Sequence, residues 1–264
     1  MKNLSLILTA GALLMVPAQA AWAAPHTCSA NNFHVNDLVS YAETREQHLT
    51  PQSTNAIDPG ANGSVVVHGW SNNDVLVKAC IQTAAGTDSE ARALASQVEI
   101  ARGPGQIKPH GPSSDSHHYW DLSYEVWVPN HSNLEISANN GSISIETVEG
   151  KIQFRTLNGS VHLAQVGGDV DGTTTNGSLH VDLAGSSWTG RGLNATTTNG
   201  SIQLNVPENY SANVETSTVN GRVHVDFPVK VSGDVGKRLS FQLGSGGATI
   251  QARTTNGGVH ISRT

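Results

Sequence analysis

The sequence predicts a mainly β protein, a parallel β-solenoid of about six to seven coils with a small N-terminal α+β cap. Two observations carry this prediction. Gly accounts for 27 of the 264 residues and charged residues for only 14%, which is typical of a turn-rich β protein. A twelve-residue pattern also recurs six times in the C-terminal half, with apolar and polar residues alternating on either side of a central turn.

The chain begins with a secretory signal pattern. One Lys is followed by an apolar run over residues 4–16 and then by small residues in an A-x-A arrangement, which predicts a signal peptide over residues 1–24. The run is too short to anchor the mature chain, so we expect an exported protein, periplasmic or secreted and surface-associated, with no transmembrane segment. The net charge of −6 and the lack of a basic run argue against nucleic acid as a partner.

Two cysteines remain after this segment, Cys28 and Cys80. In an oxidising compartment a disulfide between them is the simplest outcome. The alternative is two separate buried thiols.

Residues 26–130 lack the repeat and are predicted to form the cap. Two strands are expected in GSVVVHGW and NDVLVKACIQT, and a third in HHYWDLSYEVWVP. A helix is expected near residues 88–99, because Thr87 and Glu90 have capping-box spacing and an apolar stripe follows them. The pair Asn62–Gly63 echoes the repeat.

Residues 131–264 are predicted to form the solenoid. The first, tenth and twelfth places of every block are Leu, Ile or Val, and the second is always polar, so each strand has one buried face. The blocks begin at Leu134, Ile152, Val170, Leu193, Val214 and Ile250.

The centre of each block is a corner. The seventh place is always Asn and the eighth always Gly, and the fifth is Thr in five of the six blocks. An Asn-Gly pair also favours an antiparallel hairpin, but identical residues at the same place in successive blocks favour parallel stacking in register. We expect the Thr and Asn columns to hydrogen-bond along the stack, and Gly to supply a left-handed backbone at the bend.

Extra residues fall only between blocks, as expected where loops bulge from one corner of a solenoid. The longest gap suggests a degenerate coil around residues 238–246. The last coil is expected to end at Ile261, leaving an exposed edge that the tail or a partner must cover.

Together, the G-x-I-x-I and T-N-G repeats, GSVVVHGWSNNDVLVKA, the helix start SEARALA and the strand end VWVP resemble a bacterial exported family labelled putative adhesin, a domain of unknown function. The resemblance covers about residue 60 to the end. It implies an exported β-solenoid with no established catalytic activity.

The eleventh place carries an outward-facing column rich in histidine. His162 and His180 are expected on adjacent coils, about 5 Å apart, and His224 and His260 occupy the same place in later blocks. Such a stripe binds a metal ion or an anionic partner, or is simply an exposed polar column. His110, His117 and His118 form a second group around a loop.

Other candidates lie on strands and corner loops. Arg155 and Asp171 face outward one coil apart, and Asp169 with Asp171 would be the carboxylates of a polysaccharide-cleaving enzyme. Trp188, near Arg191 in a corner loop, either stacks on a sugar or closes its own loop.

The sequence contains no G-x-S-x-G, H-E-x-x-H, C-x-x-C or P-loop spacing. We therefore expect a non-enzymatic adhesin or envelope scaffold without a cofactor, presenting its polar face to an envelope or surface protein or polysaccharide. The alternatives are a carbohydrate-active β-helix enzyme and a metal-binding protein that uses the stacked histidines.

Overall fold

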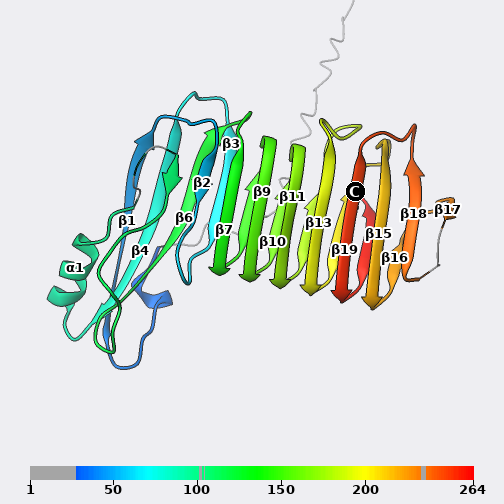
Figure 1. Ribbon diagram of the computed structural model, residues 1–264. Helices are drawn as coiled ribbons and strands as arrows, with labels where there is room; N and C mark the ends of the chain where they lie inside the picture. Colours follow the sequence, from blue (N-terminus) through cyan, green and yellow to red (C-terminus); the bar gives the residue numbers. More distant parts are fainter. Residues whose placement is uncertain (1–27, 101–102, 104, 233–235) are drawn as a thin grey trace, which may run out of the picture.

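The computed structural model describes residues 28–100, 103, 105–232 and 236–264, so the predicted signal peptide lies outside the described residues. Within this part of the chain, two ten-stranded sheets enclose an elongated apolar core (Figure 1). Sheet A has the strand order β1-β4-β6-β3-β8-β10-β12-β14-β20-β16, and sheet B has the order β17-β18-β15-β19-β13-β11-β9-β7-β2-β5.

Each repeat block contributes one strand to each sheet, with the Asn-Gly corner between them. Neighbouring blocks pair in parallel and in register, as between Val161 and Leu179 in sheet A or Val170 and Leu193 in sheet B. The predicted parallel stacking is therefore confirmed, and the antiparallel hairpin alternative is wrong. The strand pairs are β7 (Leu134–Asn140) and β8 (Ile143–Glu146), β9 (Glu149–Asn158) and β10 (Val161–Ala164), β11 (Gly167–Asn176) and β12 (Leu179–Asp182), β13 (Gly192–Asn199) and β14 (Ile202–Val206), β15 (Ala212–Asn220) and β16 (Val223–Val225), and β19 (Thr249–Asn256) and β20 (Val259–Arg263).

The Asn and Thr columns at the corners form the predicted hydrogen-bond ladders. Asn158 donates its side-chain amide to Asn140 Oδ1 at 2.7 Å, and Asn176 donates to Asn158 at 2.7 Å. Thr174 Oγ1 donates to the Gly159 carbonyl one level away, at 2.8 Å. These bonds satisfy polar groups at every bend and fix the register of successive levels.

The reason for glycine at the corner differs from our expectation. Gly141, Gly159, Gly177, Gly200 and Gly221 do not have the left-handed backbone that we predicted. Instead, a Cβ at Gly177 would lie 2.1 Å from the carbonyl oxygen of Gly159 on the neighbouring level, and the other corners are equally tight. Glycine is needed because backbones approach too closely for any side chain.

The spatial order of the blocks differs from their order in the sequence. β19 pairs with β13 on one side and with β15 on the other, and β20 likewise lies between β14 and β16. The Asn ladder follows the same path, from Asn199 to Asn256 and then to Asn220. The last segment is thus an interior layer, and the prediction that the stack ends at Ile261 is wrong.

The stack ends instead with the block that contains β15. There β18 (Arg238–Leu243) pairs antiparallel with β15, and β17 (Val231–Ser232) pairs with β18. The predicted degenerate coil around residues 238–246 is therefore an antiparallel strand, with only β17 between it and the edge of the sheet. Its reversed direction covers β15 without offering another repeat surface.

At the other end, the echo at Asn62–Gly63 is a corner joining β2 (Asn55–Ile57) to β3 (Val65–Trp70), which pair in parallel with β7 and β8. In sheet A, β6 (Tyr119–Pro129) pairs in parallel with β3, and β4 (Val75–Ala85) and β1 (Val39–Leu49) then follow in antiparallel pairings. β5 (Gln106–Ile107) ends sheet B, and η1 (Ala30–Asn32) precedes β1.

The helix α1 (Asp88–Ser96) begins where the capping box predicts, since Thr87 Oγ1 accepts a hydrogen bond from the Glu90 amide. It packs against β4 and β1. The predicted disulfide between Cys28 and Cys80 is present, with the two Cα atoms 5.3 Å apart, and it ties the chain before η1 to β4.

Candidate functional site

The histidine column lies on the outer face of sheet A, between inward-facing apolar residues. His162 on β10 and His180 on β12 are in register, and their ring centroids are 5.0 Å apart, as predicted. Because β20 lies beside β16, His260 and His224 are also neighbours, with centroids 5.4 Å apart. Gln203 on β14 separates the two pairs.

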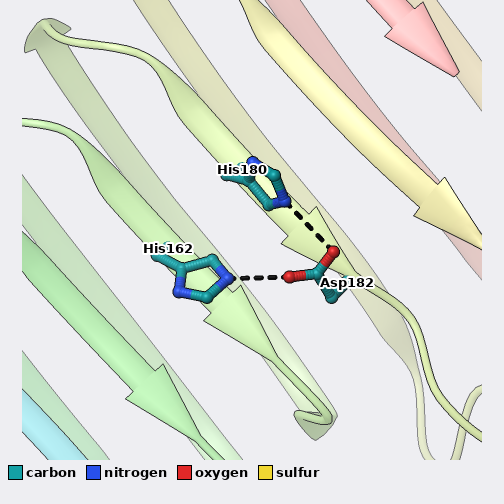
Figure 2. Close-up of side chains that lie close together, drawn as sticks. All are labelled: His162, His180 and Asp182. Carbon is teal, nitrogen blue, oxygen red and sulfur yellow. Dashed lines mark hydrogen bonds and ion pairs between the residues drawn. The ribbon is translucent and has the colours of Figure 1, made fainter. Parts of the chain in front are cut away.

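A carboxylate joins the first pair of imidazoles (Figure 2). His162 Nε2 lies 2.8 Å from Asp182 Oδ2, and His180 Nε2 lies 3.1 Å from Asp182 Oδ1. Asp182 follows His180 by two residues on β12 and so projects from the same face. Its register partner on β10 is Ala164, whose small side chain leaves room for the diagonal contact with His162.

The second pair repeats this arrangement. His224 Nε2 lies 2.8 Å from Asp226 Oδ1, and His260 Nε2 lies 2.6 Å from Asp226 Oδ2. Asp226 again follows the histidine of its own strand by two residues. The residue after Ile261 on the neighbouring strand is the small Ser262. We call these groups the inner triad (His162, His180 and Asp182) and the outer triad (His224, Asp226 and His260).

The two aspartates were not predicted, although the sequence carries a signal for them. Both triads contain the tripeptide His-Val-Asp, at residues 180–182 and 224–226. The Asp lies one place beyond the twelve-residue block, where the residue type varies from block to block.

The inner triad is the more enclosed of the two. The Asp182 side chain is 15% exposed, against 39% for Asp226. Asn205 on β14 donates its amide to Asp182 Oδ1 at 2.6 Å and is itself held by Ser262 at 2.7 Å. Burial alone would raise the pKa of Asp182, but hydrogen bonds from His162 and Asn205 and the proximity of His180 lower it below its usual value.

A shallow depression of about 420 Å³ lies between the triads on the same face. It crosses β12, β14, β20 and β16, and its floor is formed by buried residues such as Ile202. At the ninth place, the neighbouring blocks have Ser178, Ser201 and Arg222, whereas the block that contains β20 has Gly258, and all four residues line the depression. His180, Gln203, His260 and His224 line the depression along the eleventh place.

The other predicted candidates lie elsewhere. Arg155 and Asp171 are exposed on the outer face of sheet B, where Asp171 accepts a hydrogen bond from Asn194 at 2.6 Å. Arg191 lies 3.6 Å from Asp169 in a surface ion pair. The structure therefore does not bring these residues together with the histidine column.

The position of Trp188 contradicts the alternative in which its ring stacks on a sugar. Its side chain is buried, and its Nε1 donates to the Gly168 carbonyl at 3.0 Å. The ring belongs to the apolar core and bonds to β11, so it is not an exposed platform for sugar stacking. Of the second histidine group, His118 lies beside Asp115 at 3.2 Å, whereas the His110 backbone pairs with Glu99.

Among the described residues, no helix is both long and apolar enough to cross a membrane. The model of the Toastrack family, DUF4097, matches residues 81–262, which is more than half of the chain. The chain belongs to this family. The expected membership of a domain family of unknown function is thereby confirmed.

The comparison with solved structures finds weak similarities to proteins from several bacteria. A putative cell adhesion protein from Clostridium sporogenes is 11% identical, with a TM-score of 0.42, and the alignment covers 85% of this chain and all of that one. A putative adhesin from Bacteroides fragilis is 12% identical, with a TM-score of 0.37, covering 84% and 97%. A putative lipid binding protein from Parabacteroides distasonis is 10% identical, with a TM-score of 0.33, covering 84% and 96%. No curated protein matches this chain significantly.

Proposed function

We propose that this Toastrack protein is an exported, non-enzymatic binding scaffold that holds an acidic polysaccharide of the cell envelope on the outer face of sheet A. The observation that carries the proposal is the composition of the depression. Arg222 and the imidazoles of His180, His224 and His260 line it, together with serine hydroxyls, and its lining contains no carboxylate.

These groups suit uronate or phosphate units of a polymer. The guanidinium of Arg222 attracts negative charge and matches the oxygens of a carboxylate or phosphate, and hydroxyl and amide groups such as Ser201 and Gln203 bind sugar hydroxyls. The depression is open and shallow, and it follows the stack across four strands, so an extended chain fits it better than a small enclosed ligand. The ladder of backbone hydrogen bonds beneath it makes the surface rigid, which reduces the entropic cost of binding.

The carbohydrate-active alternative has weaker support. Asp169 and Asp171 are engaged in surface contacts with Arg191 and Asn194, and neither is buried. Glycoside cleavage usually needs one carboxyl with a raised pKa beside an ionised one, which requires two different environments. A scaffold that binds the polysaccharide without cleaving it therefore fits these residues better than an enzyme does.

The proposal is tested by calorimetry with polygalacturonate oligomers and with neutral dextran oligomers of equal length at pH 6. We expect binding of the acidic oligomer, weakened at least tenfold by Arg222→Ala and by added salt. Arg155→Ala, on sheet B, is the matched control and should bind like the wild type. Equal affinity for both polymers, or an Arg222→Ala variant with unchanged affinity, would refute the proposal. Release of new reducing or unsaturated ends that is abolished by Asp171→Ala would establish the enzyme instead.

A further inference from the structure

We propose that the inner triad is a binding site for a divalent transition-metal ion such as Zn²⁺ or Cu²⁺, and that the outer triad is a second, weaker site of the same kind. This inference goes beyond the polysaccharide proposal and does not depend on it. It rests on the donor set, the separations of the donor atoms and the recurrence of the same constellation.

The donor set comes first. Each triad offers two imidazole nitrogens and one carboxylate oxygen, which is a common ligand set for borderline metal ions. Three protein ligands leave a fourth tetrahedral position for water or a ligand atom, and that position faces solvent here because both triads lie on the outer face of sheet A. Hard ions such as Mg²⁺ are disfavoured, because they prefer oxygen ligands.

The separations of the donor atoms are close to those of a bound metal. In each triad, one donor atom from each residue lies within 4.8 Å of the other two. In a tetrahedral site with bonds of 2.0 to 2.1 Å, ligand atoms are separated by about 3.3 Å. In the inner triad, the contacts of 2.8 and 3.1 Å go to different oxygens of Asp182, so rotations of the Asp182 carboxylate and the two rings bring one oxygen and two nitrogens to this separation.

The backbone also fixes the donors before any ion arrives. His162 and His180 occupy register-paired positions on parallel strands, and Asp182 lies two residues along the same strand face. The site is therefore built on three positions of a rigid ladder, and little conformational entropy is lost on metal binding. Surface histidines on mobile loops do not have this advantage.

The constellation occurs twice in equivalent places. In both triads the aspartate follows the histidine of its own strand by two residues, and the second histidine is at the eleventh place of the neighbouring strand on the cap side. That neighbour carries a small residue two positions later, Ala164 in one case and Ser262 in the other. The second occurrence arises from a chain crossing, because His260 reaches His224 only through the insertion of β20.

The environments of the two triads predict their relative affinities. The inner side chains are more enclosed, and Asn205 orients Asp182 through a 2.6 Å hydrogen bond. The outer side chains are 39% to 70% exposed. Because partners that orient a ligand commonly change metal affinity 10- to 100-fold, we expect the inner site to be about tenfold tighter or more.

The test uses the folded chain without a polyhistidine tag, titrated with ZnCl₂ by calorimetry and with CoCl₂ by visible absorption. We expect two unequal zinc sites and the intense visible bands of tetrahedral Co²⁺. Asp182→Asn keeps the shape of the side chain but removes its charge and one acceptor oxygen, and it should weaken the tighter site at least 100-fold, leaving the weaker one intact. Asp226→Asn should do the reverse.

His118→Ala is the matched control, since His118 and Asp115 form a surface pair that lacks a second imidazole. It should leave both sites unchanged. His162→Gln provides a second variant of the inner site, and a zinc-induced rise in Tm that is reduced in this variant shows binding to the folded chain. Absence of zinc binding at millimolar concentration, or binding that survives both Asp182→Asn and His162→Gln unchanged, would overturn the proposal. A loss of zinc sites without a loss of polygalacturonate binding separates this inference from the proposed function.

Discussion

The corner glycines can be tested directly, by asking why the eighth place of every block is Gly. A Cβ at position 200 would lie 2.1 Å from the carbonyl oxygen of Gly177 and 2.5 Å from its carbonyl carbon. Backbone of the neighbouring level cannot rotate away as a flexible side chain does. The levels must therefore separate by about 1 Å at this corner before the contact becomes normal.

That displacement has a calculable cost. It stretches the bond from the Gly177 amide to the Asn199 carbonyl, at 3.0 Å, and the bond from Thr197 Oγ1 to the Gly177 carbonyl, at 2.8 Å. It also stretches the ladder bond from Asn199 to Asn176, at 2.8 Å. Losing two or three bonds at about 1 kcal/mol each, with about 1 to 2 kcal/mol of strain, gives a loss of about 3 to 5 kcal/mol for Gly200→Ala.

The assay is equilibrium unfolding in urea, followed by circular dichroism, with hydrogen exchange at the corner amides. Gly258→Ala is the matched control, because its Cβ would lie 3.5 Å from the nearest atom, the Arg222 carbonyl oxygen, in ordinary contact. It should change the free energy of unfolding by less than about 0.5 kcal/mol. Gly200→Asn should be as harmful as Gly200→Ala, whereas a left-handed corner would tolerate Asn better. A Gly200→Ala variant within about 0.5 kcal/mol of the wild type would refute the steric explanation.

Two further predictions follow from other parts of the molecule. Burial raises the pKa of Asp121 on β6 to about 6, although a hydrogen bond with Asn62 opposes the shift. The neutral carboxyl therefore stabilises the fold fully below about pH 4, and this contribution is lost as the pH rises through about 6. Asp121→Asn should raise the free energy of unfolding by about 1 to 2 kcal/mol at pH 7.5 and by almost nothing at pH 4. A variant with equal effects at both pH values would contradict this. The strand order is tested with pairs of introduced cysteines, whose disulfides are detected by mass spectrometry of unreduced peptides. Asn194→Cys with Gln251→Cys should cross-link, because the two positions lie about 5 Å apart on adjacent strands. Asn194→Cys with Glu215→Cys should not cross-link, because β19 lies between the two strands and separates these positions by about 10 Å. Preferential cross-linking of the second pair would show that the blocks stack in sequence order.

The repeat predicts the register of the strands because its columns have physical requirements at fixed places. Asn at the seventh place bonds to the Asn of the neighbouring block, and Thr at the fifth bonds to that block's corner Gly carbonyl, as Asn176 and Thr174 do. Both bonds require the blocks to lie in register. Buried places at the first, tenth and twelfth positions exclude a slip of one residue. Parallel stacking was thus readable from the sequence alone.

The order of the levels could not be predicted, because the blocks are interchangeable at these places. The block that begins at Ile250 fits between its neighbours as well as it would fit at the end. Strand β1 was missed for a different reason: none of its residues is fully buried, so Val39–Leu49 carries no apolar alternation. The two triads were half predicted, since the histidines lie within the repeat and the aspartates just beyond it.

The inserted level also links the fold to the second triad. If β15 and β16 stacked directly on β13 and β14, His224 would lie beside Gln203, and Asp226 would face an amide at the eleventh place of its neighbour. The return of the chain through β18 and β19 places β20 in that gap and brings His260 to Asp226. The inner triad needs no such rearrangement, because its two blocks are consecutive in the sequence. The outer triad therefore depends on the strand order, and it exists only because the blocks do not stack in the order of the sequence.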